Sequence, residues 1–239
     1  MMLGQVLLSM LVLLGVAGPA RADIKILDWG FDRDAPGSFP AGFVAGKATG
    51  EAGRWEVTTD PKATSLPHVL ALIGSDQAGA EPQVIFIEGA EAGNLDLTVR
   101  IKAVPGGSGQ GGGVVFRAQD DRNYYVVWLS PQEKLVRLDK VVNGEVKPLQ
   151  DLKVETAEVG KWHSLRLSIH GPLLEAIYDN RQFLSAREDA WQHGSYEKGK
   201  LGLWARGAAV TYFDNLRLTA MDEGTGSQPL GGTETTIIK

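Results

Sequence analysis

The chain of 239 residues contains no cysteine, and this absence limits how the fold can be held together. No disulfide can form, and the lipid-modified N-terminal cysteine of bacterial lipoproteins is excluded. An exported protein without disulfides depends on its hydrophobic core, a pattern commoner among bacterial periplasmic or secreted proteins than among extracellular animal domains. With 43% hydrophobic residues, the chain can bury a substantial core.

Basic residues and histidines are also few. The chain has 24 Lys and Arg against 29 Asp and Glu, a formal net charge of −5 and a pI near 5.4. Because binding to phosphates needs a basic surface, we expect no nucleic-acid partner. The four histidines, at positions 68, 163, 170 and 193, lack the spacing of a metal site. His163 alternates with apolar residues, which predicts a hydrogen-bonded core histidine.

A long apolar run is absent after residue 22. Residues 1–22 themselves have the features of a secretory signal peptide: an apolar run from Val6 to Val16, a Gly18-Pro19 break, and a small-x-small cleavage site ending at Ala22. An uncleaved membrane anchor is the alternative, but the run is short for a bilayer span. We therefore expect a periplasmic or secreted bacterial protein with no stable membrane span after cleavage.

An amphipathic helical pattern of usable length is missing too. Short strand-like segments follow one another instead, and Leu95 to Ala103 shows the clearest alternation of apolar and polar residues. This predicts an all-β fold, a two-sheet antiparallel jelly-roll sandwich, over residues 23–221, with a flexible tail over 222–239. The Gly- and Pro-rich stretch up to Gly53 predicts a surface excursion, and Pro105 to Gly113 predicts a mobile loop at the rim of a sheet.

The stretch from Gly111 to Gly144 predicts a three-stranded antiparallel meander. If Ala118 faces Tyr124 across the first turn and Leu129 faces Leu135 across the second, residues directly opposite share a face. One face then carries Val114, Phe116, Tyr124, Val126, Trp128, Val136 and Leu138. The other carries Arg117, Tyr125, Val127, Arg137 and Asp139. This polar floor fits a ligand-binding surface or an ordinary solvated sheet face with cross-strand charge pairs.

The order of several motifs resembles a known family. The motifs are GGGVVFRAQDDRNYYVVW, VVNGE, GKWHSLRL, IYDNRQFL and GKLGLWARGAAVTYFDNLRL, and the likeness runs from Phe31 to Leu218. The succession resembles bacterial concanavalin A-like, laminin-G-like jelly-roll domains, and it is most similar to the 3-keto-disaccharide hydrolase-type branch, which is related to family-sixteen glycoside hydrolases. The resemblance implies the same sandwich fold, which hosts lectins, glycosidases, lyases and structural modules.

Three positions depart from the family pattern. The resemblance implies a basic residue where Trp128 stands, and therefore an open face on the Trp128 side of its strand. That is the side which the register count above buries. The closing motif of the hydrolase-type relatives carries Gln and His where this chain has Trp204 and Arg206, which weakens any transfer of enzymatic activity.

Sugars are bound by aromatic faces together with Arg, Asp or Asn side chains. The ligand-binding candidates are Arg117, Tyr125, Trp128, Arg137, Trp204 and Arg206, although Trp128 and Trp204 also suit a filling role inside the sandwich. A glycosidase needs two carboxylates across one sugar bond, and no strand here carries the spaced acids of family-sixteen glucanases. No catalytic residue is therefore assigned, and Asp139 and Glu188 are only weak candidates.

Calcium is the one metal that the sequence suggests. Terminal strands often pair in jelly rolls, which would bring acids such as Asp32 near Asp214, and hard cations need several oxygens from loops. The alternative is that Asp214 caps the last strand turn. No cofactor is required. We favour an exported non-catalytic module that binds a glycan or cell-envelope polymer; the alternatives are a glycoside hydrolase or lyase acting on a modified disaccharide, and a structural or protein-interaction domain of the cell envelope.

Overall fold

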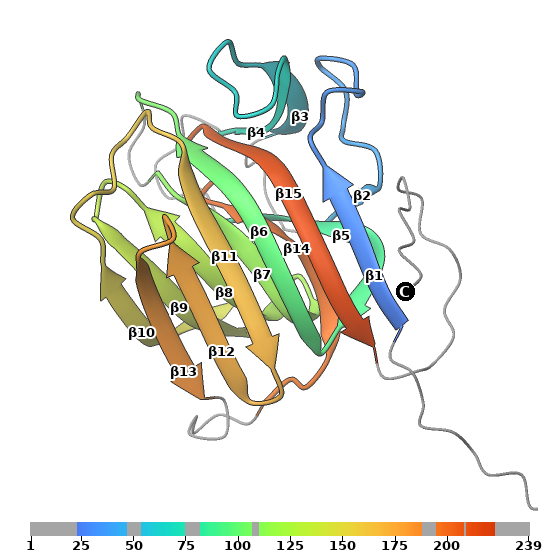
Figure 1. Ribbon diagram of the computed structural model, residues 1–239, viewed down its shortest axis with the longest axis vertical. Coiled ribbons are helices and arrows are strands. Elements are labelled where there is room, and N and C mark those ends of the chain that lie inside the picture. Colours follow the sequence, from blue (N-terminus) through green and yellow to red (C-terminus); the bar gives the residue numbers. More distant parts are fainter. Residues whose placement is uncertain are drawn as a thin grey trace, which may run out of the picture.

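The computed structural model describes residues 23–46, 54–74, 82–106, 110–187, 195–207 and 209–222. These residues form fifteen strands in two antiparallel sheets that pack face to face, and they include no helix (Figure 1). The predicted all-β, two-sheet sandwich is therefore confirmed. Residues 1–22 and 223–239, which cover the predicted signal segment and almost all of the predicted tail, lie outside the described residues. The described part of the chain contains no helix able to cross a membrane.

Sheet A is the layer nearer the viewer in Figure 1. Its order is β13 (Gln182–Arg187), β12 (Leu173–Tyr178), β11 (His163–His170), β6 (Asn94–Ala103), β15 (Thr211–Asp222), β4 (His68–Ile73) and β3 (Arg54–Thr59). The long strand β15 has two partners on one side, because β4 pairs with its first residues and β1 (Asp23–Trp29) with the remainder. The two ends of the described chain thus lie side by side.

Sheet B lies behind sheet A in Figure 1. Its order is β10 (Glu145–Lys153), β9 (Leu135–Val142), β8 (Asn123–Ser130), β7 (Gly112–Asp120), β14 (Gly199–Ala205), β5 (Gln83–Ala92) and β2 (Phe43–Ala45). The predicted meander is β7, β8 and β9. Strand β2 was not expected, because it lies in the Gly- and Pro-rich stretch; it pairs through only three residues with β5.

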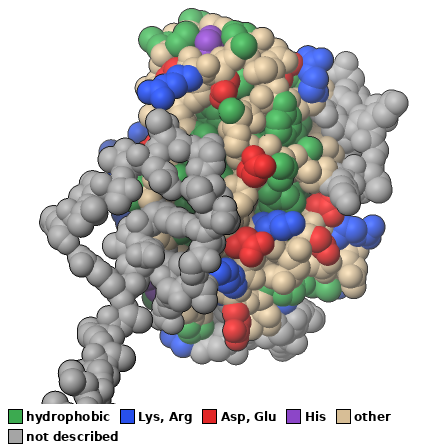
Figure 2. All heavy atoms as spheres, turned by 90° about the vertical axis from the view of Figure 1, so that its right-hand side faces the viewer, with side chains coloured by type: hydrophobic (Ala, Val, Ile, Leu, Met, Phe, Trp, Pro, Cys, Tyr) green, Lys and Arg blue, Asp and Glu red, His purple; other side chains and the backbone are tan. Residues whose placement is uncertain are grey.

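The strand predicted over Leu95 to Ala103 is β6, which begins one residue earlier, at Asn94. In β6 the alternation holds from Leu95 to Ile101, with the apolar side chains buried and the polar ones between them more exposed. Gly112 and Gly113 belong to strand β7, although they were expected in the loop at the rim. Acidic and basic side chains are interspersed over the face of the molecule that Figure 2 shows.

The main core fills the space between the sheets. It contains Leu97, Val99 and Ile101 from sheet A and Phe116 and Tyr125 from sheet B. A second apolar cluster lies on the outward side of sheet B, and its members are Val84, Phe86, Val115, Ala118, Tyr124, Val126, Trp128, Val141 and Trp204. Sheet B is therefore apolar on both faces, which is why strict alternation of polar and apolar residues is lost in β7 and β8.

The predicted register of the meander is wrong by one residue at both turns. Phe116, not Arg117, lies opposite Tyr125, because the register shifts between Phe116 and Asp120. At the second turn Ser130, not Leu129, pairs with Leu135. A shift of one residue turns each side chain to the opposite face. The inward face is thus made by Val114, Phe116, Tyr125, Val127, Val136 and Leu138, while Tyr124, Val126, Trp128, Arg137 and Asp139 face outward.

The irregularity that causes the first shift is at Arg117. Its backbone φ is 47°, in the left-handed region that non-glycine residues seldom adopt. An extra residue in one strand of an antiparallel pair produces this kind of bulge and moves the side chains beyond it to the other face. Trp128 therefore lies on the side of its strand opposite to the one that the predicted register gave it.

Candidate functional site

Two of the predicted ligand-binding residues do not reach a surface site. Tyr125 is fully buried between the sheets, where its ring stacks on Phe116 with 5.4 Å between centroids. Arg117 is only 4% exposed. Its Nη2 donates to the carbonyls of Gly93 (2.8 Å) and Gly171 (2.7 Å), and its Nε donates to Gly93 (3.1 Å). Both assignments are corrected: Tyr125 is a core residue, and Arg117 ties β7 to turns that flank strands of sheet A.

The other four candidates come together on the outward side of sheet B. Trp128 of β8 and Trp204 of β14 both lie opposite Gly113 of β7. Because glycine has no side chain, the two indole rings can meet above that strand, with centroids 5.3 Å apart. A Cβ at Gly113 would lie 2.6 Å from Cβ of Trp128. The glycine thus allows the tryptophan pair to form. Its role was not predicted from the sequence, because the two tryptophans lie beside it only through strand pairing.

Two guanidinium groups lie over Trp128. The Arg206 guanidinium lies 4.5 Å from the centroid of the Trp128 ring, and that of Arg137 lies 5.8 Å away. Trp128 is 3% exposed and Trp204 5%. The tryptophans therefore neither fill the space between the sheets nor form an open stacking platform, as the two sequence hypotheses had them. Trp128 supports both arginines, and Trp204 packs against Trp128.

The arginines are themselves held by acids. Nε and Nη2 of Arg137 donate to the two carboxylate oxygens of Asp151 at 2.6 and 2.8 Å, and this lowers the pKa of Asp151. Arg206 Nη1 donates to Glu133 Oε1 at 2.8 Å. These four side chains are partly open to solvent, with 27% to 48% of each exposed. They present fixed donors and acceptors at the surface.

Asp139 lies beside this layer with its carboxylate buried. Oδ2 accepts a hydrogen bond from Trp128 Nε1 at 2.7 Å, while Oδ1 is buried and has no partner among the described residues. Burial raises the pKa of Asp139, against the Trp128 hydrogen bond and the charges of Arg137 and Arg206, which lower it. We call Trp128, Trp204, Arg137, Arg206 and Asp139 the tryptophan face.

The other predicted acids do not join this cluster. Glu188 lies outside the described residues. Asp32 accepts a hydrogen bond from the His68 amide at 3.0 Å. Asp214 is fully buried and accepts four hydrogen bonds, from the amide and hydroxyl of Ser65, the hydroxyl of Thr64 and the amide of Asn215.

These contacts give Asp214 a role without a metal. They attach the loop before β4 to β15. Among the described residues no group of three or more His, Asp or Glu side chains has a metal-binding arrangement. Structural calcium stays a prediction.

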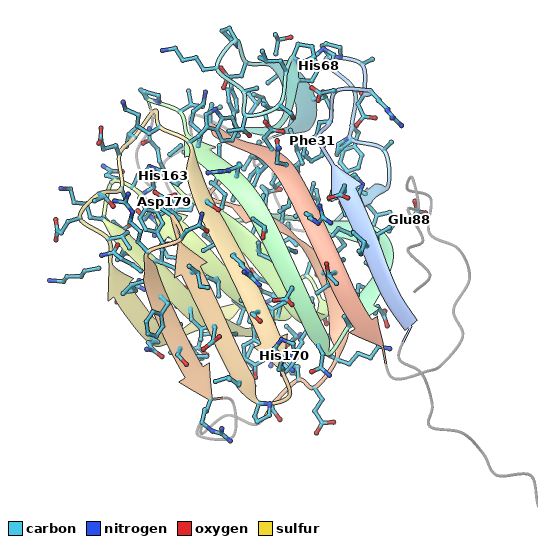
Figure 3. The ribbon with its side chains drawn as sticks, in the orientation of Figure 1. Phe31, His68, Glu88, His163, His170 and Asp179 are labelled. Atoms are coloured by element: carbon cyan, nitrogen blue, oxygen red, sulfur yellow. The ribbon has the colours of Figure 1, made fainter. Side chains whose placement is uncertain are left out.

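A second polar site lies at one end of sheet A, where Figure 3 shows His163 and Asp179 next to each other. His163 is 4% exposed; its Nδ1 is 2.9 Å from Asp179 Oδ2 and 2.8 Å from the Tyr178 hydroxyl, and its Nε2 accepts from the Glu158 amide at 3.1 Å. The predicted hydrogen-bonded core histidine is confirmed. His170 lies at the other end of β11 (Figure 3).

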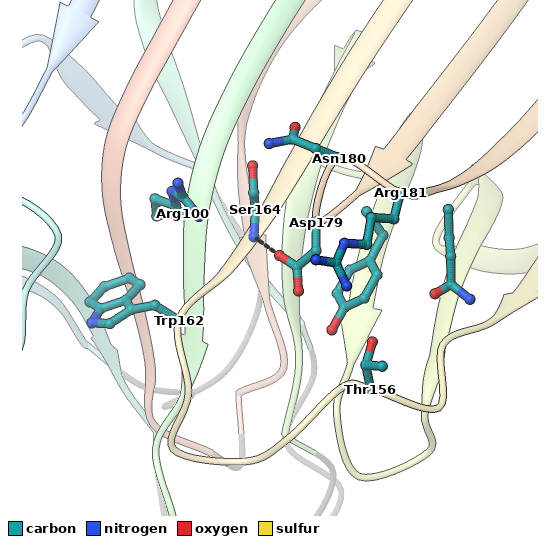
Figure 4. Close-up of a pocket in the computed structure, with 9 residues that line it drawn as sticks. Arg100, Thr156, Trp162, Ser164, Asp179, Asn180 and Arg181 are labelled. Carbon is teal, nitrogen blue, oxygen red and sulfur yellow. Dashed lines mark hydrogen bonds between the residues drawn. The ribbon is translucent and has the colours of Figure 1, made fainter.

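Next to this histidine is a cavity of about 470 Å³. Figure 4 shows Arg100 and Trp162 on one side of it, Asn180 and Arg181 on the other, and Ser164 and Asp179 between them. Thr156, Tyr178 and Gln182 complete the lining. The sequence reading assigned no function to these residues, because they come from four separate segments.

Solved structures share this fold at low sequence identity. Carbohydrate-binding module CBM66 from Bacillus subtilis is 18% identical, with 74% of this chain and 94% of that chain covered and a TM-score of 0.57. Domain 4 of AbnA, a GH43 extracellular arabinanase from Geobacillus stearothermophilus, in complex with arabinotriose, is 13% identical. The match covers 84% of this chain and 93% of that chain, with a TM-score of 0.54. A protein of unknown function from Shewanella oneidensis is 11% identical, with 90% of this chain and 93% of that chain covered and a TM-score of 0.55.

No protein-family model matches the chain, and no curated protein sequence does. The likeness to solved structures thus establishes the β-sandwich fold, and function has to be argued from the residues.

Proposed function

We propose that this protein is an exported, non-catalytic module that binds a glycan or another cell-envelope polymer through the tryptophan face. One observation carries the proposal: two guanidinium groups are held over Trp128, which packs against Trp204, beside a buried carboxylate with an oxygen that has no partner among the described residues. A cluster of this kind is not required to close the sandwich, because the main core lies on the other side of the sheet.

The chemistry of the face suits sugar hydroxyls. Arg137 and Arg206 supply several N–H donors, and the acids that hold them, Asp151 and Glu133, supply acceptors. Because the arginines rest on aromatic rings and pair with acids, they lose little conformational freedom when a ligand binds, which favours affinity. The ligand is bound by polar contacts above the indoles, and not by stacking on exposed rings.

Relatives in fold support the same class of ligand. One similar structure is a carbohydrate-binding module, and another is an arabinanase domain in complex with arabinotriose. A location outside the cytoplasm, in the periplasm or secreted, agrees with this role and with a chain that contains no cysteine.

A glycan array with the wild-type protein and Arg206→Ala tests the proposal. We expect Arg206→Ala to lose at least about tenfold in affinity for the best wild-type ligand, because charge-assisted hydrogen bonds are lost. Arg217→Ala is the matched control: it also removes one positive charge, but from an exposed side chain of sheet A. Equal affinities for all three proteins would remove the tryptophan face from the binding site, and absence of any glycan binding would favour a structural or protein-interaction domain.

Hydrolysis of a glycosidic bond is the second candidate, in particular of a 3-keto-disaccharide as the family resemblance suggests. The observation in its favour is that burial raises the pKa of Asp139 while Arg137 lowers that of Asp151, so one acid tends to keep its proton and the other to lose it. The test is release of monosaccharide from 3-keto and unmodified disaccharides. Turnover by the wild type that Asp139→Asn abolishes would establish an enzyme; no turnover would exclude these substrates.

Calcium is tested separately by thermal unfolding with and without a chelator. If an ion joins Asp32 and Asp214, the chelator lowers the midpoint, because a ligand that binds only the folded state stabilises it. An unchanged midpoint would show that the hydrogen bonds of Asp214 suffice.

A further inference from the structure

We propose that the cavity at the end of sheet A is a second binding site, and that its ligand is a carboxylated sugar, a hexuronate. We call it the arginine pocket, lined by Arg100, Arg181, Asp179, Asn180, Ser164 and Trp162 together with Thr156, Tyr178 and Gln182. It goes beyond the function proposed above, because it lies on the other sheet and shares no residue with the tryptophan face.

The pocket presents positive charge that is not used within the protein. The guanidinium groups of Arg100 and Arg181 make no ion pair and no side-chain hydrogen bond with the described residues, whereas eight other Lys or Arg side chains in that part of the chain do pair with acids. The Asp179 carboxylate is engaged by other groups, because Oδ1 accepts from the Ser164 amide at 2.7 Å and Oδ2 lies 2.9 Å from His163 Nδ1.

The charge count matches a carboxylate. With two arginines and one aspartate, the lining has a formal charge of +1. A carboxylate carries one negative charge and accepts two parallel N–H bonds from a guanidinium, so it suits this pocket better than a phosphate dianion does. A bare inorganic ion would also leave most of the 470 Å³ unfilled.

The remaining lining suits the ring and hydroxyls of a sugar. The hydroxyl of Ser164 makes no hydrogen bond with the described residues, and Thr156 and Asn180 are exposed polar side chains at the rim. The Tyr178 hydroxyl lies 2.8 Å from His163 Nδ1. Trp162 supplies an apolar wall (Figure 4). Charged, polar and aromatic groups therefore converge on one hollow.

The turn that carries Arg181 is held in place. Asp179 and Asn180 have φ values of 45° and 57°, the left-handed backbone that Asp and Asn tolerate best. The Asp179 amide donates to the Ser164 carbonyl at 2.9 Å, while the Asp179 carboxylate accepts from the Ser164 amide at 2.7 Å. This double link attaches the β12–β13 turn to β11 and positions Arg181 opposite Arg100.

The experiment compares D-galacturonate with D-galactose, which differ only in the carboxylate at C6, by titration calorimetry at low salt. We expect galacturonate to bind at least about tenfold more tightly than galactose. Arg100→Gln and Arg181→Gln each reduce the affinity for galacturonate at least about tenfold, while Arg217→Gln and Arg206→Ala leave it unchanged. Inorganic phosphate is included as an anion without a sugar ring. Thermal melts of each variant confirm that it is folded.

Each other outcome overturns the assignment. Equal affinity for galactose and galacturonate would remove the role of the carboxylate. Phosphate that binds as tightly as galacturonate would remove the role of the sugar. A loss in Arg217→Gln as large as in Arg100→Gln would show an effect of overall charge. Because Arg206→Ala affects only the tryptophan face, failure of one site is distinguishable from failure of the other.

Discussion

Replacement of Arg117 tests the part of the structure that differs most from the sequence reading. The sequence predicted that Arg117 lies on a ligand-binding floor, in which case Arg117→Ala would weaken binding and leave the fold intact. In the structure Arg117 is buried and bonds the carbonyls of Gly93 and Gly171. We therefore expect Arg117→Ala to destabilise the protein.

The size of the loss follows from these contacts. A hydrogen bond that involves a charged group contributes about 1.5 to 3 kcal/mol. Gly171 is exposed, so its carbonyl regains water when the arginine is removed, whereas that of Gly93 lies in a half-buried turn. We expect a loss of about 3 kcal/mol, which for a domain of this size lowers the unfolding midpoint by roughly 6 to 12 °C. Arg117→Lys, whose ammonium cannot span both carbonyls as the guanidinium does, is expected to lose about half as much.

The assay is urea unfolding followed by tryptophan fluorescence, with glycan binding measured per folded molecule. Arg166→Ala is the control, because that side chain is half exposed and its contact with Asp96 is 3.5 Å long; a loss below about 1 kcal/mol is expected. If Arg117→Ala were as stable as Arg166→Ala but had lost binding, the bulge, the register and the inward position of Arg117 would all be refuted.

Three further predictions concern buried groups. In Asp60, burial raises the pKa, but hydrogen bonds from Lys102 and from a backbone amide outweigh it and lower the pKa below 3.8. The stability from this pair is therefore present above pH 3.8 and is lost as pH falls through the folded pKa, so Asp60→Asn should reduce the loss of stability at acid pH. Asp139 has the opposite effect, because its raised pKa makes the wild type gain stability as pH falls toward 3.8. Asp139→Asn should abolish that gain; if stability depended on pH as in the wild type, the carboxyl group of Asp139 would not be buried. Gly113→Ala should cost about 3 kcal/mol and change the tryptophan emission, because the new Cβ overlaps Trp128; wild-type stability would mean that the tryptophan pair does not form.

The strands were predictable because the signal for each is local. In β6, apolar and polar residues alternate over most of the strand, and this pattern is readable without any knowledge of the partner strands. Histidine at position 163 could be placed in the core on the same ground. Strand β2 could not be found, because three residues among glycines and prolines carry no period and are strand only through pairing with β5.

The tryptophan face was predicted in part. Trp128, Arg137, Trp204 and Arg206 were named as candidates, and the structure brings them together; Tyr125 was named for the same reasons and lies in the core. Both faces of β8 are apolar, so composition could not say which one lies between the sheets. The arginine pocket was missed because its residues are unremarkable in sequence and meet only where β6, β11 and the β12–β13 turn end together.

The sequence alone determined that this chain is a two-sheet β-sandwich. Alternation of apolar residues over many short segments is a local property, and a strand with this pattern buries its apolar face whatever the order of the strands. Only the tertiary structure decided which side chains face the solvent. The bulge between Phe116 and Asp120 and a shorter second turn each place the pairing one residue away from the predicted register. In a strand with a side-chain period of two, that difference exchanges the inside for the outside. The sites of this protein therefore depend on strand pairing, which involves contacts between residues far apart in the chain.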